Sequence, residues 1–254
     1  MSTFGRTSVV FDLDGTLVDS EPNYYEASRA LLADFTGREY TWADNEQYVG
    51  ISSVETLARW RTEYGIEASA AELLADLDRR YLELARANTP VYPEMRKLVE
   101  HLHEAGVPMA VASGSSRAAI EAILAGTGLD ARLTTVVSAE EVPRGKPAPD
   151  VFLAAAGLLG ADPADCVVFE DAAPGALAAR AAGMRCVAIP YVAAHASDEA
   201  FTSADLVFRG GHGEFTAQAA LEVLAPRKGA SPEGRPRQTT NPEPLKQPRP
   251  PAQA

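Results

Sequence analysis

Two aspartates one residue apart follow a short apolar run near the start of the chain. Asp12 and Asp14 come directly after residues 9–11, whose β-branched and aromatic side chains predict a buried strand, and Gly15 predicts the turn that ends it. Two ionised carboxylates this close repel each other, so a hard divalent cation such as Mg²⁺ is the expected neutralising partner.

With a cation bound, Asp12 can give it one oxygen and keep the other as a nucleophile. Asp14 can bind the cation through its backbone carbonyl and use its carboxyl group for proton transfer. Taken alone, the same pair fits a turn cap at Asp12 and a solvated side chain at Asp14 equally well.

A hydroxyl and a lysine lie at two further chain turns. Ser113 and Gly114 follow an apolar run and precede a helical pattern, an arrangement that presents a hydroxyl and free backbone N–H groups to an oxyanion. Lys146 lies in a loop stiffened by Pro147, which suits a cation fixed beside a phosphoryl oxygen. Individually, Ser113 fits a helix N-cap and Lys146 a solvated side chain.

A second acidic pair follows another apolar run. Glu170 and Asp171 come directly after residues 166–169. If both runs are strands of one parallel sheet, this pair faces the loop that holds Asp12 and Asp14 and completes an oxygen-rich site for Mg²⁺. The alternative for Asp171 alone is a helix cap, but the combination of four such strand ends favours a catalytic site.

Helical and strand-like patterns alternate from residue 94 onward, which predicts an α/β protein with a parallel sheet covered on both faces. The expected helices are 94–105, 117–125, 150–157 and 175–182, and the expected strands after residues 9–11 are 107–112, 134–137, 166–169, 186–189 and 206–208.

The chain divides into three parts by pattern. Residues 21–88 carry helical patterns only, with Ser20 as the expected cap of the first helix and Pro22 in its first turn, and they predict an all-helical insert. Residues 1–20 and 89–225 are expected to form the sheet-containing core. Residues 226–254 hold eight prolines and almost no aliphatic side chains, so we expect a disordered tail.

The formal charge of −12 disfavours binding of nucleic acid or anionic membranes, so an anionic substrate must be attracted locally. No run of 18 apolar residues is present and the N-terminus lacks the apolar stretch of a secretory signal, which predicts a cytoplasmic protein; the oligomeric state is left open. Cys166 and Cys186 are expected to be small buried side chains. The four histidines, His101, His103, His195 and His212, are expected at surface or loop positions.

In this order, Asp12-x-Asp14, Ser113-Gly114, Lys146-Pro147 and Glu170-Asp171 resemble the four motifs of the haloacid dehalogenase (HAD) superfamily. The likeness covers about residues 7–224 and is strongest to the β-phosphoglucomutase and small-sugar-phosphatase branch, which has a helical cap after the first motif.

The resemblance implies a Rossmann-like core under a mobile cap, with Asp12 as the nucleophile that forms an aspartyl-phosphate and Asp14 as general acid and base. It implies that the phosphoryl group is held at one set of residues and Mg²⁺ at another. The implied phosphate-binding residues are Ser113, Gly114 and Lys146; the implied metal-binding residues are Asp12, Asp14 through its carbonyl, and Asp171, with Glu170 in or next to the metal shell.

The expected function is therefore Mg²⁺-dependent hydrolysis of a small phosphomonoester, a sugar phosphate being one example. The alternatives are a β-phosphoglucomutase-like phosphomutase and a catalytically silent binding protein. Mutases of this group place an arginine in a Gly-x-Ser-Arg cap loop, where this chain has Ser53, although Arg59 and Arg61 lie close enough in sequence to replace it. The candidate entrance residues are Glu21, Asn23, Tyr24, Trp42 and Ser52.

Overall fold

The structure is a computed structural model that describes residues 4–48, 51 and 53–224. Within these residues one all-parallel sheet forms, with strand order β3-β2-β1-β4-β5-β6. The strands are β1 (Ser8–Phe11), β2 (Met109–Ser113), β3 (Thr135–Ser138), β4 (Cys166–Glu170), β5 (Arg185–Ala188) and β6 (Leu206–Val207). The predicted parallel α/β sheet is confirmed. Because the chain leaves β1 first toward β3 and then toward β6, a crevice is expected at the carboxyl ends of β1 and β4.

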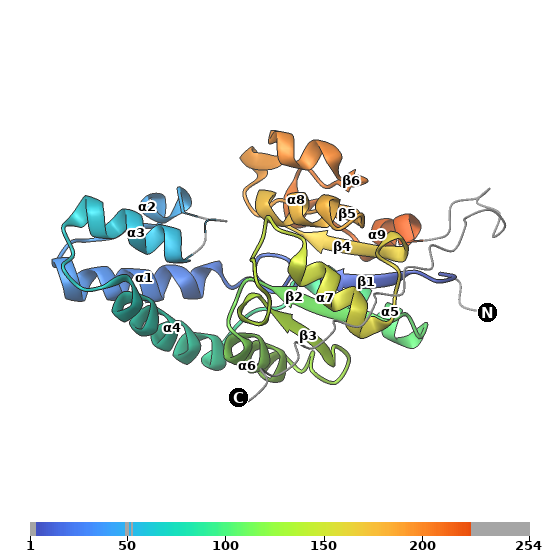
Figure 1. Ribbon diagram of the computed structural model, residues 1–254, viewed down its shortest axis with the longest axis horizontal. Coiled ribbons are helices and arrows are strands. Elements are labelled where there is room, and N and C mark those ends of the chain that lie inside the picture. The colour runs from blue at the N-terminus through green and yellow to red at the C-terminus, as the bar shows by residue number, and fades with distance from the viewer. Residues whose placement is uncertain (1–3, 49–50, 52, 225–254) are drawn as a thin grey trace, which may run out of the picture.

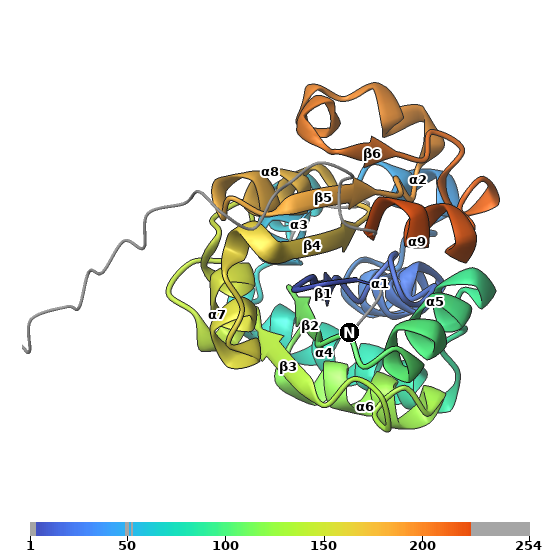
Figure 2. The ribbon, with the colours of Figure 1, turned by 90° about the vertical axis from the view of Figure 1, so that its right-hand side faces the viewer.

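Helices cover both faces of the sheet, and this explains why the interior positions of the strands are apolar (Figure 2). Val9 and Phe11 belong to a core shared with α5 (Pro93–Glu104), α6 (Arg117–Thr127) and α9 (Ala217–Leu224). Val10 points to the opposite core, which it shares with α7 (Asp150–Leu159) and α8 (Ala173–Ala181). Successive side chains of a strand point to opposite faces, so a strand covered on both faces needs apolar side chains on both.

The remaining helices follow β1 and lie beyond the carboxyl ends of the strands (Figure 1). They are α1 (Glu21–Thr36), α2 (Trp42–Glu46), α3 (Ser53–Tyr64) and α4 (Ala70–Ala87), and we call them the cap. Helix α4 contacts α1, α3 and the core helix α6. Its start is fixed by a capping box, in which Ser69 accepts a hydrogen bond from the Glu72 N–H and Glu72 accepts one from the Ser69 N–H.

Some boundaries differ from the sequence expectation. Strand β2 begins at Met109 instead of residue 107, since Pro108 has no N–H to donate to a ladder. Helices α2 and α9 were not predicted because they span only 5 and 8 residues, too few to display a clear period.

Cys166 and Cys186 are buried and free, as expected. Across the described ranges no helix has the length and apolar content needed to span a bilayer. The predicted disordered tail, residues 226–254, lies outside the described residues.

Candidate active site

Asp12 lies at the centre of the sheet edge, directly beside the end of β4. Phe11 pairs with Phe169, and the Asp12 N–H continues the ladder by donating to the Phe169 carbonyl at 2.9 Å. This register sets Asp12 next to Glu170. Lys146 reaches both from the loop before α7, with its Nζ 2.5 Å from Asp12 Oδ1 and 2.7 Å from Glu170 Oε1.

The three charged groups of this cluster are almost fully removed from solvent, with side chains 12%, 7% and 2% exposed for Lys146, Asp12 and Glu170. Burial raises the pKa of Asp12 to about 7, and the charges of Glu170 and Asp14 add to this while Lys146 opposes it. Burial alone would lower the pKa of Lys146, but the two carboxylates outweigh it and raise that pKa. Lys146 is therefore a permanent cation at the nucleophile position.

Asp14 is held by four hydroxyl groups from three segments of the chain. Its Oδ1 accepts from Ser20 Oγ at 2.7 Å and from the Tyr81 hydroxyl at 2.9 Å. Its Oδ2 accepts from Ser115 Oγ at 2.6 Å and from Ser113 Oγ at 3.1 Å. Tyr81 belongs to cap helix α4, so the carboxyl group assigned to proton transfer touches both the core and the cap.

Ser20 differs from the sequence expectation of a helix cap. It occupies the N-cap position of α1, but its side chain makes no capping hydrogen bond and is turned to Asp14 instead. The N-cap interpretation of Ser113 does not apply either. The N-cap of α6 is Ser116, which accepts from the Ala119 N–H at 3.3 Å.

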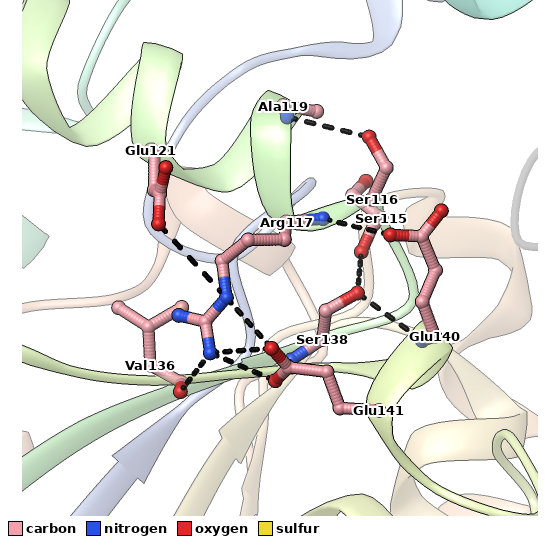
Figure 3. Close-up of polar contacts among 9 residues, drawn as sticks. All are labelled: Ser115, Ser116, Arg117, Ala119, Glu121, Val136, Ser138, Glu140 and Glu141. Carbon is pink, nitrogen blue, oxygen red and sulfur yellow. Dashed lines mark hydrogen bonds and ion pairs between the residues drawn. The ribbon is translucent and has the colours of Figure 1, made fainter.

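A polar network fixes the loop that follows β2 (Figure 3). Ser138 Oγ at the end of β3 donates to the Ser115 carbonyl at 2.7 Å. Arg117 donates to both carboxylate oxygens of Glu141, at 2.7 and 2.8 Å, and to the Val136 carbonyl at 3.0 Å. These bonds tie the loop carrying Ser113 and Ser115 to the neighbouring strand and so hold its hydroxyls toward Asp14.

Asp171 reaches from the end of β4 to the loop after β1. Thr16 Oγ1 donates to Asp171 Oδ1 at 3.2 Å, and a side chain at Gly15 would overlap the Asp171 carboxylate. Burial raises the pKa of Asp171, with further contributions from Glu170 and Asp12. Asp171 is not a helix cap, because α8 has Ala172 at its N-cap.

The residues present fit a bound Mg²⁺ in their chemistry. In the described residues no three side chains of His, Cys, Asp or Glu gather into a ready-made metal cluster. Mg²⁺ needs only one or two carboxylates and keeps several waters, which Asp12 and Asp171 satisfy. Burial and, in addition, the neighbouring carboxylates raise the pKa values of Asp12 and Asp171, and a bound cation would favour the ionised form of both groups. Both carboxylate oxygens of Glu170 already accept hydrogen bonds, one from Lys146 and one from the Ala172 N–H. Glu170 therefore lies beside the two carboxylates, Asp12 and Asp171, that would hold the metal.

Gly175 leaves room for the Glu170 carboxylate, and a side chain there would overlap it. We expect Gly175→Ala to displace Glu170 from Lys146, which lowers the free energy of unfolding by about 1–3 kcal/mol because polar groups lose buried partners. Chemical denaturation measures this change. Gly157→Ala in α7, where an added side chain meets open space, is the matched control and should not destabilise the protein. Equal stability of both variants would contradict the packing argument.

His212 is a functional neighbour that the sequence did not indicate. It lies in a loop as expected, but it is partly buried, stacks on Tyr92 with ring centroids 3.3 Å apart, and its Nε2 lies 2.8 Å from the Gly15 carbonyl. Since a carbonyl only accepts, Nε2 carries the proton. His212 thereby supports the turn between Asp14 and Thr16, although it follows Gly15 by 197 residues in the sequence.

A cavity of about 500 Å³ lies between the cap and the core. All the predicted site residues line it, namely Asp12, Asp14, Ser113, Gly114, Lys146, Glu170 and Asp171. A cavity of this size accommodates a small organic substrate.

Of the predicted entrance residues, Glu21 and Tyr24 line the cavity. Asn23 instead bonds to the Asn88 carbonyl, and Trp42 packs against Tyr25. Ser52 lies outside the described residues.

The cap-loop stretch compared with the mutases, residues 49–54, is only partly described, since Val49 and Gly50 also lie outside the described residues. Ser53 lines the cavity. Arg59 pairs with Glu55 at 2.7 Å and Arg61 donates to the Ala68 carbonyl at 2.8 Å, and neither is among the lining residues.

A parallel sheet whose first strand ends in an Asp-x-Asp pair beside a buried lysine, under helices inserted after that strand, defines a class of capped α/β hydrolytic enzymes. Residues 7–183 match the family described as haloacid dehalogenase-like hydrolase. The chain belongs to this family of hydrolases.

Relatives of known name agree with this assignment. Fructose-1-phosphate phosphatase YqaB of Escherichia coli is 40% identical over 189 residues, which are 70% of this chain and 94% of that protein. The bifunctional riboflavin kinase/FMN phosphatase of Arabidopsis thaliana is 34% identical over 200 residues, 78% of this chain, and the match spans only 52% of that protein. The crystal structure of CbbY from Rhodobacter sphaeroides with phosphate shares the fold, with a TM-score of 0.71 and 23% identity. The likeness covers 82% of this chain and 95% of that one.

Proposed function

We propose that this protein is a Mg²⁺-dependent phosphatase that hydrolyses a small phosphomonoester through an aspartyl-phosphate at Asp12. The observation that supports this most directly is the contact of Lys146 Nζ with Asp12 Oδ1, at 2.5 Å, inside a cavity that the acidic groups Asp14 and Asp171 also line. The similarity to a fructose-1-phosphate phosphatase supports the same activity.

In the first step Asp12 attacks phosphorus and the bond from phosphorus to the leaving oxygen breaks. Lys146 neutralises phosphoryl oxygens, and Ser113 with the Gly114 backbone N–H orients them. Asp14 gives its proton to the leaving oxygen, so the product departs as a neutral hydroxyl. A carboxylate nucleophile replaces one very slow hydrolysis by two easier steps.

In the second step a water attacks the phosphorus of the aspartyl-phosphate while Asp14 takes its proton. Phosphate is released and Asp12 is restored as a carboxylate. When bound, Mg²⁺ would be held by Asp12, the Asp14 carbonyl and Asp171, and it would supply charge neutralisation for the phosphoryl group. Tyr81 donates to Asp14 from the cap, so the position of the cap governs when Asp14 is oriented for either transfer.

The same proposal divides the chain into a core of residues 1–20 and 89–225, a cap of residues 21–88 and a tail of residues 226–254. It places the protein in the cytoplasm, acting on a small molecule without a nucleic acid or membrane partner. Hydrolysis is favoured over phosphoryl return to the substrate because the described cavity lining contains no arginine for a second phosphate.

The test is hydrolysis of p-nitrophenyl phosphate with Mg²⁺, followed by EDTA. We expect EDTA to remove nearly all activity and excess Mg²⁺ to restore it. Mg²⁺ should also raise the melting temperature of the wild-type protein, and Asp171→Asn should reduce that rise, which reports binding without reference to catalysis. Full activity in EDTA would contradict the metal assignment, and absence of hydrolysis in Mg²⁺ would favour a silent binding protein.

A further inference from the structure

We propose that the substrate carries its only negative charge on the phosphate, so that its leaving group bears neither a carboxylate nor a second phosphate. This inference rests on the proposed phosphatase function and concerns the part of the cavity that the transferred phosphoryl group does not fill.

The charge of the cavity lining is strongly one-sided. Lys146 is the single lysine or arginine that the described residues contribute to it. Seven carboxyl groups line the same cavity: Asp12, Asp14, Glu21, Asp78, Glu140, Glu170 and Asp171. Lys146 is already committed to the phosphoryl end through its contacts with Asp12 and Glu170. The rest of the substrate therefore meets no cation.

Three of the carboxyl groups belong to elements other than the strand ends that carry Asp12, Asp14 and Asp171. Glu21 begins cap helix α1, Asp78 lies on cap helix α4, and Glu140 follows β3 on the core side. Asp78 and Glu140 are close enough to interact, since Glu140 adds to the effect of burial in raising the pKa of Asp78. Glu140 is held in place by the Arg117 N–H at 3.1 Å (Figure 3). A leaving group with its own carboxylate or phosphate would be repelled from both sides of the cap–core boundary.

The arginines nearest in the chain are turned away. Arg59 pairs with Glu55, Arg61 donates to the Ala68 carbonyl, and Arg117 is paired with Glu141. A bidentate arginine is the usual partner of a second phosphate, and the described lining offers none.

The cap contributes apolar side chains to the rest of the wall, namely Ile51, Val54, Leu74, Leu77 and Leu82. Uncharged polar side chains also line it, among them Asn45, Ser53 and Thr56. None of these groups can act as a counterion for a second anionic group of the substrate.

The experiment compares two pairs of competitors of p-nitrophenyl phosphate hydrolysis. Glycerol 3-phosphate and 3-phosphoglycerate differ by a carboxylate, and fructose 1-phosphate and fructose 1,6-bisphosphate differ by a second phosphate. In each pair we expect the uncharged leaving group to give an inhibition constant lower by roughly tenfold, the size of effect that a like charge a few ångströms away produces in a protein site. Equal constants, tighter binding of the charged members, or no competition by any of the four would overturn the inference.

A charge-removing variant assigns the effect to the cavity. Asp78→Asn should reduce the ratio of inhibition constants within each pair about threefold. Asp76→Asn is the matched control, because it removes the same charge from the same helix but Asp76 pairs with Arg80 and does not line the cavity. The two proposals fail separately: loss of p-nitrophenyl phosphate hydrolysis would overturn the phosphatase assignment, whereas hydrolysis with a preference for the charged competitors would overturn only the inference about the leaving group.

Discussion

An Asp12→Asn variant is expected to lose turnover by roughly 10³-fold or more while keeping its fold. The amide has the shape of the carboxylate and its oxygen can still accept from Lys146, but it cannot attack phosphorus. The substitution also removes a carboxylate whose pKa is raised to about 7 by burial and, in addition, by the charges of Glu170 and Asp14, so the melting temperature should not fall. The measurements are p-nitrophenyl phosphate hydrolysis and thermal unfolding.

The matched control is Asp130→Asn, the same change at an exposed turn after α6, which should retain full activity. If Asp12→Asn kept a substantial part of the wild-type rate, Asp12 would not be the nucleophile and the two-step mechanism would have to be abandoned. Loss of the folded state in this variant alone would instead indicate that Asp12 is needed structurally.

The position of the acidic groups was predictable from the sequence because it follows from strand topology. Asp12 and Glu170 each follow an apolar run, and parallel strands bring their carboxyl ends to one edge. Lys146 was also predictable, because a lysine between a glycine and a proline before a helix has an unusual local context. Each of these patterns taken alone also fits a cap or a solvated side chain, and it was their combination at the ends of several strands that predicted the site.

The groups that orient Asp14 were not predictable in the same way. Tyr81 fits the apolar stripe of α4, and no neighbouring residue in the sequence indicates that its hydroxyl contacts Asp14, which precedes it by 67 residues. His212 lies between glycines in a short turn, and its contact with the Gly15 carbonyl depends on how the chain packs after β6. Ser20 was expected to cap α1, but the stronger charge-assisted bond to Asp14 takes its hydroxyl. Such contacts depend on tertiary packing, which single-sequence patterns do not encode.

A Lys146→Met variant is expected to lose both activity and stability, because this lysine is the one cation among the cavity's described lining residues. Methionine preserves most of the volume but leaves the Asp12 and Glu170 carboxylates without their counterion. Removing one partner of a buried ion pair typically costs about 3–5 kcal/mol. The loss should grow as the pH rises, because Lys146 opposes the raised pKa of Asp12 and its removal makes ionisation of that carboxyl still more costly in the folded state. We expect kcat/KM to fall by roughly 10²-fold or more.

The double variant Lys146→Met/Glu170→Gln separates the two losses. Neutralising Glu170 removes one of the unpaired carboxylates, and the amide can still accept from the Ala172 N–H, so part of the lost stability should return in chemical denaturation. Activity should stay low, since no cation then faces the phosphoryl group beside Asp12. A double variant no more stable than Lys146→Met would mean that the 2.7 Å contact between Lys146 and Glu170 does not contribute to the fold. Recovery of activity together with stability would mean that Lys146 acts by supporting the structure and not by binding the substrate.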